Sequence, residues 1–238
     1  FEPEAWSLRW YRQMVGISSI GDTTVVTDKW MLGTRNSFFI GIVATLLATA
    51  LGTVAALGLS RPHMPFKAVL MAILISPMIV PLIITAAGMF FFYSKMGLTH
   101  TYLGLILAHT ALGTPFVVIT VTATLTGFDT NLIRASQSLG ADTMRTFFKV
   151  IMPLILPGVI SGGLFAFITS FDEVVVVMFV GSVEQITIPK QMWAGLRQET
   201  SPVILCMATC LVALSIALLT TVEMLRRRSE RLRGIKQR

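Results

Sequence analysis

Two adjacent carboxylates, Asp172 and Glu173, lie inside the otherwise apolar stretch SFDEVVVVMFV, residues 170–180. An acid at the middle of a membrane-spanning helix costs about 2.5 to 3.5 kcal/mol on insertion scales. That cost falls where the carboxylate faces a water-filled path, and such a carboxylate attracts a cation. Adjacent helical residues point about 100° apart, so both cannot face one way. We expect Asp172 to face a solute path and Glu173 to face a neighbouring subunit or backbone donors; the reverse assignment satisfies the same geometry.

The position of the acidic pair along its apolar segment predicts a place near the outer mouth of a path. Asp172 lies some twenty residues beyond Ile151, which is roughly 30 Å at about 1.5 Å per helical residue. Phe167 and Phe171 are close enough in sequence to add cation–π contacts to a bound cation. The alternative is structural: the acids form a salt bridge or a cap with a partner subunit.

The other chemistry-bearing residues form no catalytic or metal-ligating set. His63, His100 and His109 are scattered, and His109 lies in an apolar segment where we expect a hydrogen-bonded structural histidine. Cys206 and Cys210 share a helical face in another apolar segment and are typical of packing residues. The chain has neither a G-x-x-x-x-G-K-[ST] phosphate loop nor a G-x-S-x-G nucleophile turn. We therefore expect a non-catalytic chain without its own metal or cofactor.

The composition predicts an all-α polytopic membrane protein. Hydrophobic residues make up 54% of the chain, charged residues 13%, and the mean hydropathy is +0.75; soluble domains carry about 25% charged residues. A spanning helix needs about 20 apolar residues. Five segments qualify, at about 37–59, 66–93, 101–126, 151–180 and 203–225.

Prolines and glycines mark points where these segments can bend. The second and fourth segments are long enough to be tilted, kinked or broken, and each contains two prolines, which remove backbone donors. Ordinary helix packing is the alternative for each glycine. The candidate bending points are Pro77, Pro81, Gly88, Gly162 and Gly163.

The charge distribution predicts the orientation of the spans. The net charge is +7, and seven of the nineteen Lys and Arg residues lie in the last thirteen positions, a basic tail at 226–238. With this tail in the cytoplasm, loops 60–66 and 127–150 lie inside, whereas 1–36, 94–100 and 181–202 lie outside. Counting Lys67 with its adjoining loop, the inside holds twelve Lys and Arg residues and the outside seven, as the positive-inside rule requires. No aromatic–basic platform accompanies the charge, so we expect no nucleic-acid partner.

The inside loop 127–150 has the signals of two short helices. Asp129 or Thr130 can cap the first helix, Gly140 suits a left-handed position after it, and Asp142 or Thr143 can cap the second. This arrangement exposes Leu132, Ile133 and Met144 unless a partner covers them. Docking into a partner's groove and packing on the membrane or on the chain's own helices are both consistent with the pattern.

The stretch RASQSLGADTMRTFFKVIMP resembles the EAA motif of ABC importer permeases. Ala135, Gly140 and Pro153 match the motif, whereas Arg134 replaces the usual glutamate, Ser136 the second alanine and Met152 the leucine. The resemblance implies that this loop contacts a cytoplasmic ATPase, and that the missing glutamate removes one polar contact. The implied coupling residues are Arg134, Ala135, Ser136, Leu139, Gly140, Ala141, Asp142 and Pro153.

Further stretches extend the resemblance to the C-type membrane subunit of polyamine (spermidine/putrescine) permeases. These are WSLRWY at 6–11, ISPMIVP at 75–81, TPFVVITV at 114–121, LTGFD at 125–129 and SFDEVVVVMFV. The resemblance implies a type I ABC importer permease fold in the bacterial inner membrane, with a domain over 37–225. That family has six spans, so we expect another span before Phe1. Relatives carry other solutes, including opine-like amines, phosphonates and ferric iron, which stay open as alternatives.

The resemblance also implies partners. These are a second permease subunit, two copies of a cytoplasmic ATPase that binds ATP and Mg²⁺, a periplasmic solute-binding protein and the surrounding membrane lipid. A self-contained channel or secondary transporter is the alternative from another class; it would use more intramembrane charge and would need no docking loop. An intramembrane enzyme is disfavoured because no catalytic constellation is present.

Overall fold

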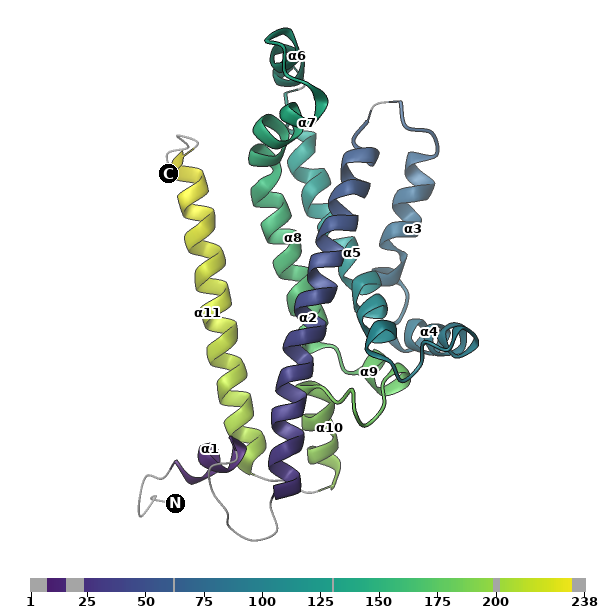
Figure 1. Ribbon diagram of the computed structural model, residues 1–238, viewed down its shortest axis with the longest axis vertical. Helices are drawn as coiled ribbons and strands as arrows, with labels where there is room; N and C mark the ends of the chain where they lie inside the picture. Colours follow the sequence, from purple (N-terminus) through teal and green to yellow (C-terminus); the bar gives the residue numbers. More distant parts are fainter. Residues whose placement is uncertain (1–7, 16–23, 62, 130, 199–201, 233–238) are drawn as a thin grey trace. The chain divides into compact units, whose positions relative to one another are not determined.

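The computed structural model describes residues 8–15, 24–61, 63–129, 131–198 and 202–232, and the regular structure in these residues is helical (Figure 1). This confirms the all-α expectation. Of the predicted outer segment 1–36, residues 1–7 and 16–23 lie outside the described residues, as do residues 233–238 of the basic tail. The helices are α1 Arg9–Met14, α2 Thr24–Leu59, α3 Lys67–Ile79, α4 Leu82–Met96, α5 Tyr102–Thr126, α6 Asn131–Ser138, α7 Thr143–Thr146, the π-helix η1 Phe147–Ile151, α8 Met152–Asp172, α9 Val175–Val180, α10 Ile188–Gln198 and α11 Pro202–Leu232.

Three stretches of the described chain are long and apolar enough to cross a membrane as single helices. They are Lys29–Leu59, Tyr102–Thr126 and Thr143–Asp172. The second predicted span, 66–93, is instead the pair α3 and α4, bent by 104° at Val80–Pro81. The backbone of Val80 is extended. The cause is the next residue, Pro81, because a proline ring disfavours helical geometry in the residue before it. The fourth, 151–180, begins earlier, at Thr143, and is interrupted after Asp172.

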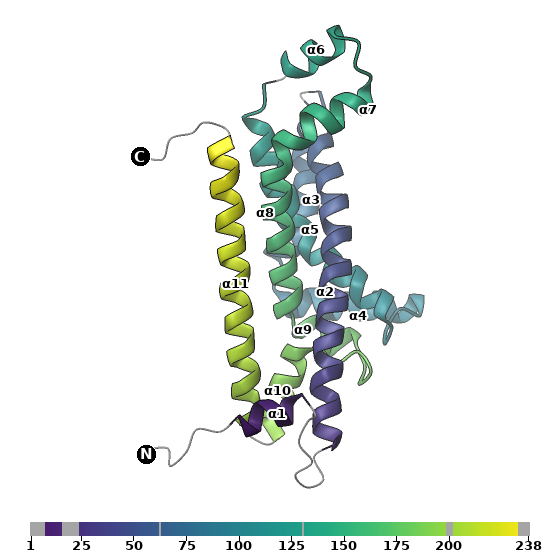
Figure 2. The same ribbon diagram turned by 60° about the vertical axis from the view of Figure 1, so that its left-hand side comes forward.

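The chain divides into two compact units, and the long helices contribute residues to both. The first unit comprises Phe1–Ile40, Met89–Leu105 and Phe171–Arg238, and the second comprises Gly41–Gly88 and Ile106–Ser170. In the first unit α1 lies at the start of α11 (Figure 2). Its core is Trp30, Ile188, Val203, Ile204 and Met207, with Phe171 packed at the edge.

The core of the second unit forms where α2, α5 and α8 pack through small residues. A Cβ at Gly52 would lie 2.7 Å from Val117 Cβ, and one at Gly162 would lie 2.7 Å from Val117 Cα. Contacts this short mean that the helix backbones meet closely, as small residues allow in membrane bundles. The packing interpretation therefore holds for Gly162, whereas Gly88 has nothing within 4 Å of an added Cβ. The buried residues are Ala48, Ala56, Val117, Val121, Ile155 and Ala166.

Candidate functional site

The two carboxylates lie where α8 ends and the chain turns into α9. Asp172 is the last residue of α8 and its side chain is exposed. Glu173 is 6% exposed, and its Oε1 accepts a hydrogen bond of 2.7 Å from the backbone N–H of Val176. Glu173 therefore caps the first turn of α9, which is the backbone-donor alternative of the two considered for this residue. An acid at this end of a helix also lies at the positive end of the helix dipole.

Lys190 lies at the other end of α9. Its Nζ donates to Val177 O at 3.3 Å and to Ser182 O at 3.0 Å. The carbonyl of Val177 also accepts from the N–H of Gly181. A lysine near the final carbonyls of a helix lies at the negative end of the helix dipole, where a cation is favoured. Burial lowers the pKa of the Lys190 ammonium from its usual range.

The segment between α9 and α10 is tied to α2 by polar side chains. Asn36 Nδ2 donates to Glu184 O at 2.8 Å and to Ile186 O at 2.9 Å. Ser37 Oγ accepts from the N–H of Ile188 at 2.9 Å. Tyr102 OH donates to Asn36 Oδ1 at 3.1 Å. These bonds satisfy backbone groups that would otherwise be buried without partners. They hold residues 184–188 against α2.

The two predicted aromatic residues differ in what they contact. Phe171 packs edge-on against Phe38, with ring centroids 5.1 Å apart, and belongs to the core of the first unit. Phe167 is half-buried on α8. The packing of Phe171 against Phe38 gives that ring a structural role beside the predicted contact with a cation.

The second candidate site is the loop that carries the EAA-like motif. Asp129 Oδ1 accepts from the N–H of Asn131 at 2.9 Å at the start of α6, and Asp142 Oδ1 accepts from the N–H of Arg145 at 2.8 Å at the start of α7. Gly140 has φ +83°, the left-handed conformation expected of it. Thr130, the other cap considered for α6, lies outside the described residues. Ser136 Oγ and Thr146 Oγ1 are 2.9 Å apart and join the two helices.

The loop presents apolar side chains to its surroundings. Leu139 is 89% exposed, Met144 65% and Leu132 43%, whereas Ile133 is half-buried. Figures 1 and 2 both show α6 and α7 beyond one end of α8. Of the other predicted coupling residues, Arg134, Ala135, Asp142 and Pro153 are exposed, and Ser136 and Ala141 are half-buried.

A π-helical turn joins this loop to α8. In η1 the N–H of Met152 bonds to the carbonyl of Phe147, five residues back. The next residue is Pro153, which has no N–H and whose ring crowds the carbonyl four residues earlier. A wider turn is a usual local adjustment beside a proline in a membrane helix. The loop therefore continues into α8 as one unbroken helical path from Thr143 to Asp172.

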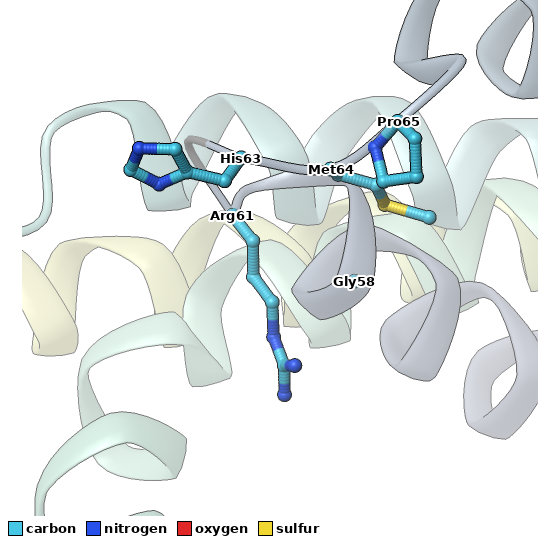
Figure 3. A pocket seen from close by; sticks show the side chains of 5 residues that line it. All are labelled: Gly58, Arg61, His63, Met64 and Pro65. Atoms are coloured by element: carbon cyan, nitrogen blue, oxygen red, sulfur yellow. The ribbon is translucent and has the colours of Figure 1, made fainter.

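Other polar features have structural explanations. His109 Nδ1 lies 2.7 Å from Ser170 Oγ, and both side chains are buried, as expected for a structural histidine. A hollow of about 540 Å³ lies at the turn between α2 and α3, lined by Gly58, Arg61, His63, Met64 and Pro65 (Figure 3). The side chains of Arg61 and His63 point in different directions there, so they do not converge on one ligand. No metal-ligating cluster occurs among the described residues.

Residues that sequence reasoning missed are Lys190, Asn36, Ser37 and Tyr102. Each is an ordinary polar residue outside any recognisable motif. Its importance comes from backbone groups that are distant in sequence, such as the 150 positions that separate Asn36 from Ile186. The exposed Asp172 and the two-helix loop were found because their signals are local.

The long apolar helices and the capped α6–α7 loop are typical of a multi-pass membrane protein. Residues 15–231 match the family model "Binding-protein-dependent transport system inner membrane component". The chain belongs to this family, and it is a multi-pass inner-membrane permease of the ABC importer class.

Individual relatives and solved structures agree with this assignment. The spermidine/putrescine transport system permease protein PotC of Haemophilus influenzae is 28% identical over 226 residues, 95% of this chain and 84% of the relative. The putrescine transport system permease protein PotI of Escherichia coli is 28% identical over 220 residues, 87% and 73% of the two chains. The fold is similar to that of the MetNI methionine ABC transporter, with a TM-score of 0.61, 21% identity, and 86% and 95% covered. An amino acid ABC transporter gives a TM-score of 0.64 at 15% identity, with 89% and 100% covered.

Proposed function

We propose that the chain is one of two permease subunits of an ATP-driven importer for spermidine, putrescine or a similar cationic amine. The observation that carries this proposal is the 28% identity, over 95% of the chain, to a permease of a spermidine/putrescine transport system. The stretch with Asp172 and Glu173 lies within the matched family region.

The exposed carboxylate of Asp172 supports a cationic solute. A polyamine carries several ammonium groups and loses much of its hydration on entering a narrow path. A carboxylate at the mouth offsets part of that loss, since hydrogen bonds to charged groups are worth roughly 1.5 to 3 kcal/mol. Glu173 does not compete for this role in the described state, because its buried side chain accepts from the backbone of α9. Asp172 is therefore the proposed solute contact, and Phe167 stays a proposed aromatic contact for the same solute.

The α6–α7 loop is the proposed contact with the ATPase. Its exposed leucines and methionine suit an apolar groove on a partner, and its two capped helices form a firm connection to α8. The 238-residue chain has no phosphate loop, so ATP and Mg²⁺ would be bound by the partner. Closure of an ATPase dimer would then push this loop and favour one of two states of the path.

Uptake by the assembled transporter tests the solute assignment. The complex of both permeases, two ATPase copies and the binding protein is reconstituted in liposomes with internal ATP. Radiolabelled spermidine and putrescine are compared with an opine-like amine, a phosphonate and ferric iron. We expect saturable uptake of the polyamines and competition by other cationic amines. Uptake of the phosphonate or of iron, with no polyamine uptake, would overturn the proposal.

A further inference from the structure

We propose that Glu173 and Lys190 act as a pair that fixes α9 through the two ends of its backbone, and that they are positioning residues for the mouth of the path. The transport part of this inference rests on the proposed function. The structural part, that the two charges hold α9, stands on the described contacts alone.

The helix α9 needs external support because it is short and poor in helix-forming residues. It has six residues, Val175–Val180, and four of them are valines. Isolated helices of this length are unstable in water, and β-branched residues lower helix propensity. Val176, Val177 and Val180 are nevertheless fully buried. Their packing requires α9 to lie in one register and one orientation.

The two ends of α9 are supported by opposite charges. The first turn receives the carboxylate of Glu173, 2.7 Å from Val176 N. At the last turn, the ammonium Nζ of Lys190 lies 3.3 Å from Val177 O. The same Nζ lies 3.0 Å from Ser182 O, just beyond the helix. Each charge lies at the end of the helix where the backbone dipole favours it. The two residues therefore cooperate through the helix between them.

A third bond places the end of α9 against another part of the same unit. The N–H of His100 donates to Val180 O at 2.7 Å. The last turn of α9 is thus held both by Lys190 and by the turn that precedes α5. With both ends held, the peptide that follows Asp172 has a fixed course, and Asp172 leaves α8 in a defined direction. Loss of the hydrogen bonds of either side chain would release α9 without changing the carboxylate of Asp172.

The test combines local hydrogen exchange with transport kinetics of the assembled complex. The variants are Glu173→Ala, Lys190→Met and the double variant, with Glu173→Gln and Lys190→Arg as conservative partners. We expect at least ten-fold faster amide exchange over residues 176–180 in each single alanine or methionine variant, with exchange over 203–217 unchanged. In the double variant, the exchange rate over residues 176–180 should rise by less than the product of the two single-variant increases. The reason is that one change alone already releases α9.

Transport kinetics distinguish positioning from direct solute contact. We expect Glu173→Ala and Lys190→Met to lower the maximal uptake rate several-fold while the KM for solute stays within two-fold. Lys190→Arg should retain most of the maximal uptake rate, because it keeps the positive charge and the hydrogen-bond donors. Glu173→Gln keeps an acceptor for Val176 N and loses the charge, so its amide exchange over residues 176–180 should lie between those of wild type and Glu173→Ala. It also replaces the alanine variant if that variant fails to insert.

Two results would overturn the inference. The first is unchanged exchange over 176–180 in the single variants. The second is a raised KM in Glu173→Ala with an unchanged maximal rate, which would make Glu173 a solute contact. If the wild-type complex carries no amine at all, the proposed function fails, and the exchange measurement still decides whether the pair holds α9.

Discussion

Asp172 and Glu173 are consecutive residues with opposite surroundings: the first is exposed, whereas the second is 6% exposed and bonded to the backbone of α9. The difference arises because α8 ends at Asp172 and the chain turns before α9 begins at Val175. The exposed carboxylate of Asp172 is the proposed solute contact, and the buried carboxylate of Glu173 is proposed to hold α9. This separation leads to different expectations for the two positions.

Replacing Asp172 by Asn should weaken capture of the cationic solute. The variant keeps the size of the side chain and removes the charge, so we expect the KM for uptake to rise about ten-fold, equivalent to about 1.4 kcal/mol. Expression and thermal stability should stay near wild type because the side chain is exposed. Glu184→Gln, at another exposed acid of the same unit, is the matched control and should leave the KM unchanged. Equal KM values for all three proteins would remove the electrostatic role of Asp172.

Replacing Gly140 should uncouple ATP hydrolysis from uptake. Alanine at φ +83° is strained by roughly 1 to 2 kcal/mol, and proline cannot adopt that angle. We expect more ATP to be hydrolysed per solute imported in Gly140→Ala, and a larger loss of uptake in Gly140→Pro, while both proteins insert. The ratio of phosphate released to solute imported measures the effect.

Another glycine of the predicted inside loop 127–150 provides the control. Gly127→Ala adds a methyl group with nothing within 4 Å, and no left-handed angle is required there. It should retain normal coupling. Normal uptake by Gly140→Pro, with an unchanged ratio, would contradict the docking role of the loop.

Gly162 and Gly88 should respond differently to the same substitution. Gly162→Ala places a methyl group 2.7 Å from Val117 Cα, and such overpacking costs about 1 to 3 kcal/mol. Gly88→Ala meets no atom within 4 Å and should be close to neutral. Thermal unfolding of the two purified variants in detergent measures the contrast. A Gly162→Ala protein as stable as wild type would show that α5 and α8 do not pack this closely.

The burial of Lys190 predicts a pH dependence of stability in the alkaline range. Burial lowers the pKa of this ammonium in the folded protein, whereas a lysine in an unfolded chain has a pKa of about 10.4. The unfolded state then binds the proton more readily, so the free energy of unfolding rises with pH between the folded-state pKa and about 10.4. The cost of the buried charge is fully present below that window.

Lys190→Met should lack this alkaline gain. Relative to the variant, the wild-type protein should become more stable as the pH is raised through the window, as measured by melting temperatures across a pH series. The exposed Lys95→Met variant is the control for general alkaline effects. A constant difference between wild type and Lys190→Met over the series would contradict the assignment.

Local sequence signals predicted the features that depend on local physics. The caps at Asp129 and Asp142 and the left-handed Gly140 each follow from a few neighbouring residues, and the structure shows all three. The prolines at 77 and 81 indicated a break in the second segment. The bend of 104° could not be predicted, because a proline indicates a break but does not fix the angle between the two helices.

The course of the chain after Asp172, through residues 173–188, could not be predicted from those residues alone. The run VVVVMFV is equally consistent with a buried helix or a strand and has no turn residue to mark a boundary. The expectation of a continuous helix through Asp172 and Glu173 is therefore wrong, because α8 ends at Asp172 and α9 begins at Val175. The segment is held by Asn36, Ser37 and Lys190, and partners that distant leave no local pattern.

Uptake with and without the ATPase tests the central claim most directly. Liposomes containing the two permease subunits alone are compared with liposomes containing the full complex, binding protein and internal ATP, using radiolabelled spermidine against a concentration gradient. The account predicts accumulation only in the complete system with ATP. Accumulation by the permease subunits alone, with no ATPase present, would contradict it.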